Sequence, residues 1–545
     1  MVRHSASMWP LSTVALCLIC LSGCGQLRAA EEVRSNPGRR PASLTIRCLD
    51  ADTGATLPAW AIVVGPDGKR VESNDDPELF VVSNNSFLFE KSYTLPVPDG
   101  RLAVAAERGF DYAIGRKTVD IGHGANQVTI PLKRIADPRA HGWYCAPAHI
   151  HMQVSKSNPK YSHETIVDMM SWWPAAGGYD ILINHAMGVG EESLPSTVWG
   201  WNADYFPAGR WHPPHGIPYD TLYDMGEEFR ANPEGHVLFW NLQSYVEPGS
   251  AGSESYLPGR YNVPLVADAG QECVDQGGYF AFAHTGGGNS LEVSVCLGQC
   301  SAINMGDLAF VYDRWYRLLN AGFRVSVVAG PDFIFTNGAR FYAKVRGEFS
   351  WKSWMNAVRR GRTFATSGPL LFATVHGLDP GEELRLDEPG DVQVRVEAVS
   401  KHTFEAIQIV VNGEIIRTVA TEGDRRSVNV DTTIPIGQSS WIGVRTIGHP
   451  GEEMVWEDVD DPAVRPRFMR QSHTTPVYCL VGDRALGSVG ALNEIAHWNE
   501  VFFRDWVEKT ARFPDESDRR RALEHFSRAQ KVIEGMIEKR QRPQP

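Results

Sequence analysis

The 545-residue sequence has no concentrated run of Lys and Arg, and its 53 basic residues are outnumbered by 65 acidic ones, which gives a formal net charge of -12. Proteins that bind nucleic acid need a basic face to neutralise phosphates. This charge balance therefore excludes nucleic acid as an expected partner. The 43% of hydrophobic and 22% of charged residues are instead typical of a folded globular protein.

Long hydrophobic runs are absent beyond the N-terminus, so no later segment has the roughly 20 apolar residues of a transmembrane helix. The first 24 residues combine Arg3 with an apolar run over 9–21, a pattern typical of an export signal. The sequence Leu21-Ser22-Gly23-Cys24 resembles the bacterial lipoprotein box, whereas Arg28-Ala29-Ala30 offers a simpler cleavage site. We predict a signal peptide at 1–24, a linker at 25–42, and an exported protein that is periplasmic or lipid-anchored to the cell envelope. Contact with a membrane is expected only through that anchor.

Cysteine is scarce as well, with nine residues of which three fall in the predicted signal peptide. The other six are scattered, and Cys296 and Cys300 lack the C-x-x-C spacing of a zinc or redox motif. We therefore assign the cysteines no chemistry and leave their pairing open.

The spacing of apolar residues changes twice along the chain and predicts a multidomain α/β plus β protein. Short alternating segments in 43–138 predict an N-terminal β-sandwich, and a similar pattern in 369–485 predicts a second one. Between them, in 139–368, apolar strands alternate with helical patterns, which indicates a parallel sheet or barrel. Those helical patterns lie at 164–173, 221–230, 266–276, 309–320 and 352–360, and a helical tail is expected at 490–540.

Eight of the 17 histidines fall between residues 149 and 284. His149 and His151 lie on one face of an extended segment, because side chains alternate along a strand, so both can reach one ion. His185, His284 and Asp332 follow predicted strands, and active sites of α/β barrels form at the carboxyl ends of strands. His236 departs from this rule because it opens its predicted strand.

Imidazole nitrogens and carboxylate oxygens suit Zn, Mn or Fe. The placement of these side chains at successive strand ends therefore predicts a site for a divalent metal. Its candidate ligands are His149, His151, His185, His236, His284 and Asp332.

The segment Gly142-Trp143-Tyr144 followed by His149-Ile150-His151 resembles the start of the CehA/McbA-type metallohydrolases, relatives of the PHP (polymerase and histidinol phosphatase) superfamily. The resemblance covers roughly residues 100–482 and implies a distorted β/α barrel with the same six residues as metal ligands. Later segments match the family in the same order: Asn184-His185, Gly235-His236-Val237, Ala283-His284, residues 315–322, Gly330-Pro331-Asp332 and residues 361–369.

Three positions depart from the family pattern, because Pro147, Asn184 and Asn304 stand where that family commonly has acidic residues. Fewer carboxylates favour one or two metal ions over three. They also leave open a loss of catalysis.

Together these features predict an exported metal-dependent hydrolase that uses metal-activated water on an amide, ester, carbamate or phosphoester bond of a small-molecule substrate. Asp332 and His284 are the predicted catalytic residues, with Asp332 also accepting the water's proton. The insert at 199–219, with His212 and His215, lines or covers the pocket in this hypothesis and is a surface loop otherwise. The alternative function is a catalytically degenerate metal-binding barrel that serves as an exported binding or scaffold protein.

Overall fold

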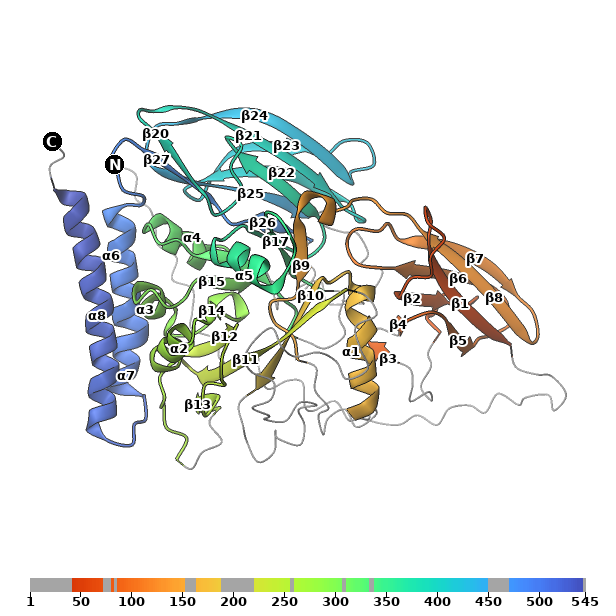
Figure 1. Cartoon of the computed structure of the whole chain (residues 1–545), viewed down its shortest axis with the longest axis horizontal. Coiled ribbons are helices and arrows are strands. Elements are labelled where there is room, and N and C mark those ends of the chain that lie inside the picture. Colours follow the sequence, from red (N-terminus) through yellow and green to blue (C-terminus); the bar gives the residue numbers. More distant parts are fainter. Residues whose placement is uncertain are drawn as a thin grey trace.

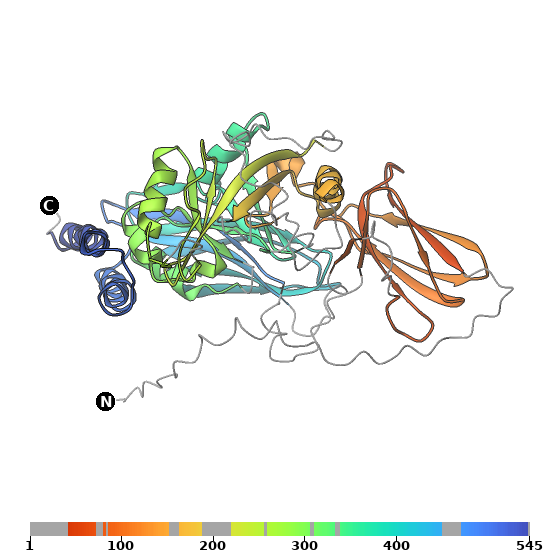
Figure 2. The same cartoon turned by 90° about the horizontal axis from the view of Figure 1, so that it is seen from below.

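The computed structural model describes residues 42–71, 80–82, 86–151, 163–187, 220–254, 259–305, 310–332, 338–448 and 470–542. Along its longest axis, a β-rich module lies at one end and a pair of helices at the other, with a curled sheet and a second group of sheets between them (Figure 1). Figure 2 shows the two C-terminal helices nearly end-on, opposite the N-terminal module. The predicted signal peptide and all but the last residue of the predicted linker lie outside the described residues.

The N-terminal module consists of two sheets that share one apolar core. In β1, every second side chain is buried, among them Leu44, Ile46 and Cys48, as expected when one face of a strand packs on a core. The sheets have the orders β5-β1-β8 and β3-β4-β2-β6-β7. Their strands are β1 (Ser43–Asp50), β2 (Ala59–Val64), β3 (Phe80–Val82), β4 (Ser86–Phe89), β5 (Tyr93–Pro96), β6 (Gly100–Glu107), β7 (Gly115–Ile121) and β8 (Ala125–Leu132).

The middle of the chain forms a curled sheet with the order β10-β11-β12-β14-β15-β16, and β13 pairs with β11. Every strand pair in it is parallel except β11–β12 and β12–β14, so β12 runs opposite to its neighbours. The strands are β10 (Ile181–Met187), β11 (Leu222–Asn232), β12 (Gly235–Trp240), β13 (Ser250–Gly252), β14 (Tyr279–Phe282), β15 (Ala302–Met305) and β16 (Ser326–Ala329).

The distorted β/α barrel that we predicted is corrected, because the described residues form a curled, half-barrel sheet and no closed barrel. One reason is that Pro233 and Glu234 alone separate β11 from β12, so these strands form an antiparallel pair with no helix between them. The helix predicted at 221–230 is in fact β11. Nearly every side chain of β11 is buried, so the strand lacks the alternation that would have distinguished it from a helix.

Five helices lie along the middle region: α1 (His163–Gly177), α2 (Val266–Asp275), α3 (Leu291–Cys296), α4 (Asp313–Asn320) and α5 (Trp351–Arg359). All but α3 coincide with predicted helical segments. In α5, Trp354 and Val358 are one turn apart and buried against strands of the curled sheet, which is how an amphipathic helix covers a sheet face. Short 3-10 turns occur at Arg139–His141 and His284–Gly286.

A nine-stranded sheet, with the main order β20-β27-β25-β26-β18-β17-β9, packs against a three-stranded sheet, β19-β21-β24, over a shared apolar core. It contains strands from both sides of the predicted boundary at 368/369, because β18 pairs with β26. The strands are β9 (Trp143–Ala146), β17 (Arg340–Lys344), β18 (Thr363–Thr366), β19 (Leu370–Val375), β20 (Glu383–Leu386), β21 (Gly390–Val399), β22 (Phe404–Val411), β23 (Glu414–Ala420), β24 (Ser427–Ile436), β25 (Ser440–Gly448), β26 (Ser472–Thr474) and β27 (Val477–Val481).

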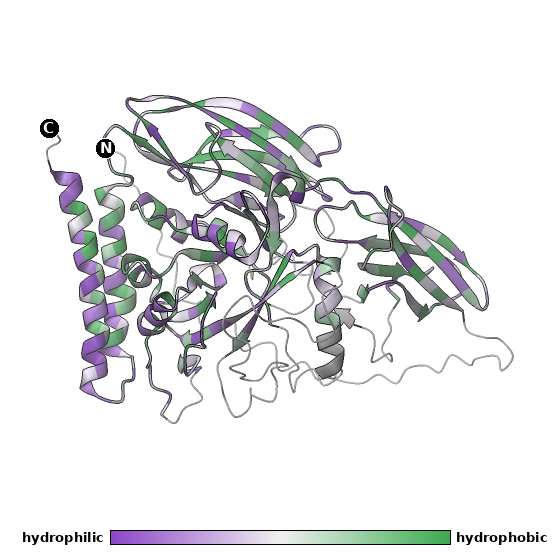
Figure 3. Cartoon of the chain, in the orientation of Figure 1, coloured by the Kyte–Doolittle hydropathy of each residue, from purple (hydrophilic) through white to green (hydrophobic). Residues whose placement is uncertain are grey.

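The C-terminal region is helical, as predicted: α6 (Val489–Trp498), a π-helical turn (Asn499–Arg504), α7 (Asp505–Lys509) and α8 (Glu516–Gln541). Hydrophilic and hydrophobic residues alternate along α8 (Figure 3). Its buried residues Ala522, His525, Ala529 and Ile533 are three or four positions apart and so form one face that packs on the body. Among the described helices, none is both long and apolar enough to span a membrane.

Candidate metal centre

His149 and His151 lie in a short extended segment that is hydrogen-bonded on both sides. The residue before His149 donates its amide N–H to the carbonyl of Ala329 at the end of β16 (2.8 Å). On the other side, the amide of His185 in β10 donates to the carbonyl of Ile150 (3.0 Å). The segment therefore lies between the two edge strands of the curled sheet, with its alternate side chains on one face.

Gly330 allows this segment to approach the end of β16 closely. A Cβ atom at Gly330 would lie 2.1 Å from the amide nitrogen of His149, which no residue with a side chain could tolerate. Two residues later, the amide of Asp332 donates to the carbonyl of His149 (3.0 Å). The Gly330-Pro331-Asp332 sequence thus places the Asp332 carboxylate next to the two histidines.

The reversed direction of β12 explains why His236 joins the site although it stands at the start of a strand. Across the antiparallel pair, His236 lies opposite Arg230 of β11. Glu228 is two residues before Arg230 and so shares its face of the strand. Because β12 is antiparallel to both neighbours, its start lies beside the end of β14, which His284 follows.

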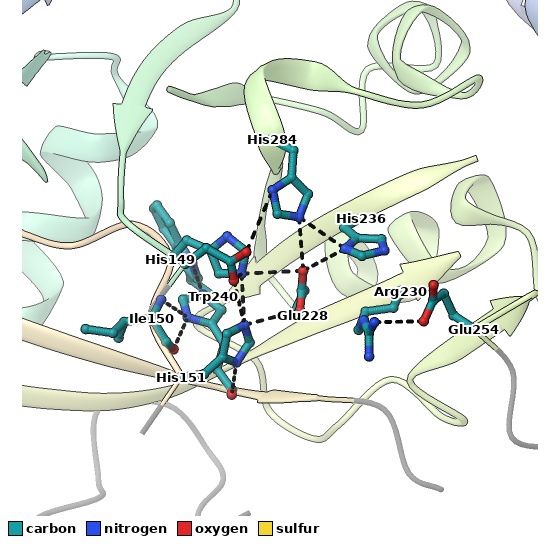
Figure 4. A network of polar contacts seen from close by, with 11 residues as sticks. His149, Ile150, His151, Glu228, Arg230, His236, Trp240, Glu254 and His284 are labelled. Atoms are coloured by element: carbon teal, nitrogen blue, oxygen red, sulfur yellow. Dashed lines mark hydrogen bonds and ion pairs between the residues drawn. The ribbon is translucent and has the colours of Figure 1, made fainter. Parts of the chain in front are cut away.

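Four side chains form a first cluster, consisting of His149, His151, Glu228 and Asp332. The Nε2 atoms of the two histidines are 3.0 Å apart. His149 Nε2 lies 3.4 Å from a Glu228 oxygen and 3.1 Å from Asp332 Oδ1, and the distances from His151 Nε2 are 3.2 and 3.3 Å. Figure 4 shows both imidazoles turned toward the Glu228 carboxylate.

Glu228, His236 and His284 form a second cluster that shares the Glu228 carboxylate with the first. His236 Nδ1 lies 3.0 Å from Glu228 Oε1 and 3.1 Å from His284 Nε2, and His284 Nε2 lies 3.6 Å from the same carboxylate oxygen. Figure 4 shows Glu228 between the two pairs of imidazoles. One glutamate thus connects all the histidines of the site.

His185, a predicted ligand, belongs to neither of the two clusters that the described residues form. Its Nε2 accepts a hydrogen bond from the indole Nε1 of Trp240 (2.8 Å), and its Nδ1 lies 3.3 Å from the carbonyl of Ile150. His185 contributes its carbonyl instead, which accepts from Nδ1 of His151 (3.0 Å). That bond leaves Nε2 of His151 as the nitrogen with a lone pair facing the cluster.

Burial and charge act in opposite directions on the groups of the first cluster. Burial alone would raise the pKa of Glu228, but the charge of His149 and hydrogen bonds from His149, His151 and His236 hold it well below its usual value. Burial would lower the pKa of His151, yet hydrogen bonds to Asp332 and Glu228 raise it. The site thus favours an anionic carboxylate next to a positive charge, which either a proton or a metal ion can supply.

The backbone is strained at the edge of the site. Three of the nine described non-glycine residues with a positive φ lie here: His284, Thr285 and Asp332, at 50°, 58° and 62°, in the left-handed region that residues other than glycine seldom adopt. Strain of this kind costs roughly 1–3 kcal/mol per residue and is concentrated at functional sites in proteins. Its location supports a functional role for the loops that carry His284 and Asp332.

Glu228 is the site residue that the sequence analysis missed, because 221–230 was predicted to be a helix. The available signal was weak: Glu227 and Glu228 are adjacent acids in a stretch that also contains Asp224 and Arg230. At the positions that depart from the family pattern, Asn184 and Asn304 are buried amides, and neither is part of the two clusters. The insert at 199–219, with His212 and His215, lies outside the described residues.

No protein-family model matches this sequence, and no curated protein is similar enough to indicate a relationship. Among solved structures, the chain has a distant similarity to PsfC from Pseudomonas syringae, with 12% sequence identity and a TM-score of 0.27. That similarity covers 39% of this chain and 88% of PsfC.

Proposed function

We propose that this chain is an exported metal-dependent hydrolase of the CehA/McbA type, with one or two divalent ions of Zn, Mn or Fe. The proposal rests on the buried clusters around Glu228 together with the sequence motifs that carry the His and Asp residues. Its metal ligands are His149, His151, Glu228 and Asp332, with His236 and His284 as ligands of a second ion.

The distances within the first cluster carry this proposal. Ligand atoms bound to one zinc ion at about 2.1 Å in a tetrahedron lie about 3.4 Å from one another. In this cluster, the five contacts among the histidine nitrogens and the carboxylate oxygens span 3.0–3.4 Å. These spacings fit a cation held between the two histidine nitrogens and the carboxylate oxygens.

The proposed catalytic groups are the most exposed side chains of the two clusters. The side chains of Asp332 and His284 are each 25% exposed, whereas that of Glu228 is 3% exposed. When bound, the metal would supply Lewis acidity and activate a water molecule. Asp332 would then accept the proton of that water, and His284 would donate a proton to the leaving group when no second ion is bound to it.

The proposed substrate is a small molecule with an amide, ester, carbamate or phosphoester bond. A mixed site of imidazoles and carboxylates suits a carbonyl or phosphoryl centre equally, so the bond type is decided by assay. The net charge of -12 supports a substrate other than nucleic acid.

Metal content of the purified protein tests the proposal. Elemental analysis should find one or two equivalents of a transition metal in the parent protein and none at this site after His149→Ala/His151→Ala. The matched control is His123→Ala/His497→Ala, because these two histidines are exposed and far from the clusters in sequence. Stoichiometric metal in the first double variant would refute the metal site.

A screen of generic ester, amide and phosphoester substrates then separates catalysis from binding alone. Turnover that is lost in Asp332→Asn, with metal retained in the other cluster, would support the hydrolase. Metal that binds without any turnover by the parent protein would favour the rival function of an exported scaffold, which the amides at Asn184 and Asn304 support.

Export is part of the proposal and has its own test. Cell fractionation should place the protein in the envelope without residues 1–24, or with Cys24 retained as the N-terminal residue if it is lipidated. Metabolic lipid labelling that depends on Cys24 would distinguish an anchored from a periplasmic protein. An intact N-terminus on cytoplasmic protein would contradict export.

A further inference from the structure

The contacts of His185 point to a role that differs from metal binding. We infer that Trp240 and His185 form a positioning pair that holds the His149-Ile150-His151 segment in place for the metal, an inference that rests on the proposed metal site. Trp240 acts through His185, and His185 acts through the backbone of Ile150.

Trp240 is a rigid donor. Its side chain is fully buried and lies stacked against Tyr279, with ring centroids 5.2 Å apart, and against Phe341, at 5.8 Å. Rings packed in this way leave the indole no room to rotate. The indole N–H is therefore fixed in its direction toward His185 Nε2, 2.8 Å away.

The indole selects one tautomer of His185. An indole N–H can only donate, so Nε2 of His185 must accept, and the proton of the neutral imidazole resides on Nδ1. That nitrogen donates to the carbonyl of Ile150 at 3.3 Å. Both nitrogens of His185 are thus engaged, and neither has a lone pair left for a metal.

Ile150 is the residue between the two proposed ligands, and His185 holds it from two directions. The carbonyl of Ile150 accepts from the main-chain amide of His185 (3.0 Å) as well as from its side chain. In return, the carbonyl of His185 orients the ring of His151 through Nδ1. A shift of His185 would therefore displace both ligating imidazoles at once.

Variants at residue 185 distinguish positioning from ligation. Glutamine offers one acceptor for Trp240 and one donor for Ile150, but an amide is a poor ligand for zinc. For His185→Gln we therefore expect unchanged zinc stoichiometry and an affinity within about threefold of the parent. His185→Phe should bind zinc about 10 to 100 times more weakly, as is usual when the support of a ligand is lost.

A double-mutant cycle tests whether Trp240 acts through His185. Trp240→Phe keeps a stacked ring but removes the donor, so we expect about a tenfold loss of zinc affinity in the parent and no further loss in the His185→Phe background. Trp315→Phe is the matched control, because Trp315 is also fully buried and its indole donates at 2.8 Å to the carbonyl of Val325. Affinity is measured by competition with a zinc-binding dye, and folding by urea unfolding.

Three outcomes would overturn the positioning pair. The first is the loss of one zinc equivalent in His185→Gln, which would make His185 a ligand. The second is one additional equivalent of bound zinc in Trp240→Phe. The third is an equal zinc affinity of Trp240→Phe and Trp315→Phe. None of these depends on His149→Ala/His151→Ala, so the proposed metal site and the positioning pair can fail separately. If Trp240→Phe does not fold, the two variants at residue 185 still decide the question.

Discussion

The guanidinium of Arg314 binds both carboxylate oxygens of Glu292 and also donates to the carbonyls of Gly286 (2.6 Å) and Gly288 (2.8 Å). Arg314 belongs to α4 and Glu292 to α3, so one side chain connects two helices to the strained loop that follows His284. The Glu292 side chain is 1% exposed and that of Arg314 is 18% exposed, so the pair is largely buried. The loop that presents His284 is therefore fixed from outside the metal centre.

Removal of the Arg314 guanidinium should lower both the stability of the fold and the metal affinity of the second cluster. Loss of one partner from a buried ion pair costs about 3–5 kcal/mol, so we expect Arg314→Gln to lower the free energy of unfolding by roughly that amount. Zinc bound by the His236 and His284 cluster should weaken as well. The control Arg324→Gln breaks a partly exposed pair with Glu383 and should cost less than about 1 kcal/mol in urea unfolding. An equal loss in the free energy of unfolding for Arg314→Gln and Arg324→Gln would contradict this prediction.

Glu227 and Glu228 provide an internal comparison of two adjacent buried acids. Burial raises the pKa of Glu227 well above its usual value, which favours the uncharged form, and its Oε2 accepts from the amide of Val246. We expect Glu227→Gln to bind metal like the parent and Glu228→Gln to lose more than roughly 100-fold in affinity, because it removes the shared ligand. Elemental analysis after dialysis measures both. Similar metal content in the two variants would exclude Glu228 as the central ligand.

Glu234 should make stability depend on pH. Burial raises its pKa from 4.5 to about 8, so between these values the folded protein holds a proton that the unfolded chain releases. Its contribution is fully present below pH 4.5 and is lost as pH rises toward 8, by up to about 1.4 kcal/mol per pH unit. Glu234→Gln retains acceptors for Ser290 and Val266 and should flatten this dependence. Urea unfolding from pH 5 to 8 in the presence of a chelator gives the slopes, which should differ between parent and variant.

A buried ion pair joins the N-terminal module to the C-terminal sheets. Lys401 Nζ lies 2.6 Å from Glu107 Oε2, and the side chains are 1% and 3% exposed. Lys401→Met should cost about 3–5 kcal/mol because it removes the cation that faces a buried carboxylate, whereas Lys401→Met/Glu107→Leu should recover most of that loss. Breaking the exposed Arg395–Asp431 pair with Arg395→Met should lower the free energy of unfolding far less than Lys401→Met does. Urea unfolding measures the stability of each variant. If the double variant were no more stable than Lys401→Met, the expectation would be contradicted.

Much of the site could be predicted from residue order alone, because its signals are local. The His149-Ile150-His151 motif shares a face by the geometry of an extended chain, and His284 and Asp332 follow short apolar strands that the structure contains. The helical tail could be predicted for the same reason, since its apolar residues repeat at helical spacing.

The other features of the site depend on strand pairing and side-chain contacts that the spacing of residues in the sequence does not reveal. The direction of β12 follows from its partners, so the placement of His236 could not be derived from its position in the strand. Glu228 was missed because a strand buried on both faces shows no alternation. The role of His185 is decided by Trp240, which comes 55 positions later and contacts it only in the folded protein.

The bridging of β10 and β16 by the His149-Ile150-His151 segment has a consequence for the order of folding. Each of its two edges bonds to a strand that comes later in the chain, and the more distant contact closes a loop of 181 residues (329 minus 148). Contacts that close long loops form late, after hairpins and locally paired strands. We therefore expect the histidine segment to be among the last parts of the chain to be enclosed during folding. A metal ion bound there would stabilise the closed position of this segment after the sheets on either side have formed.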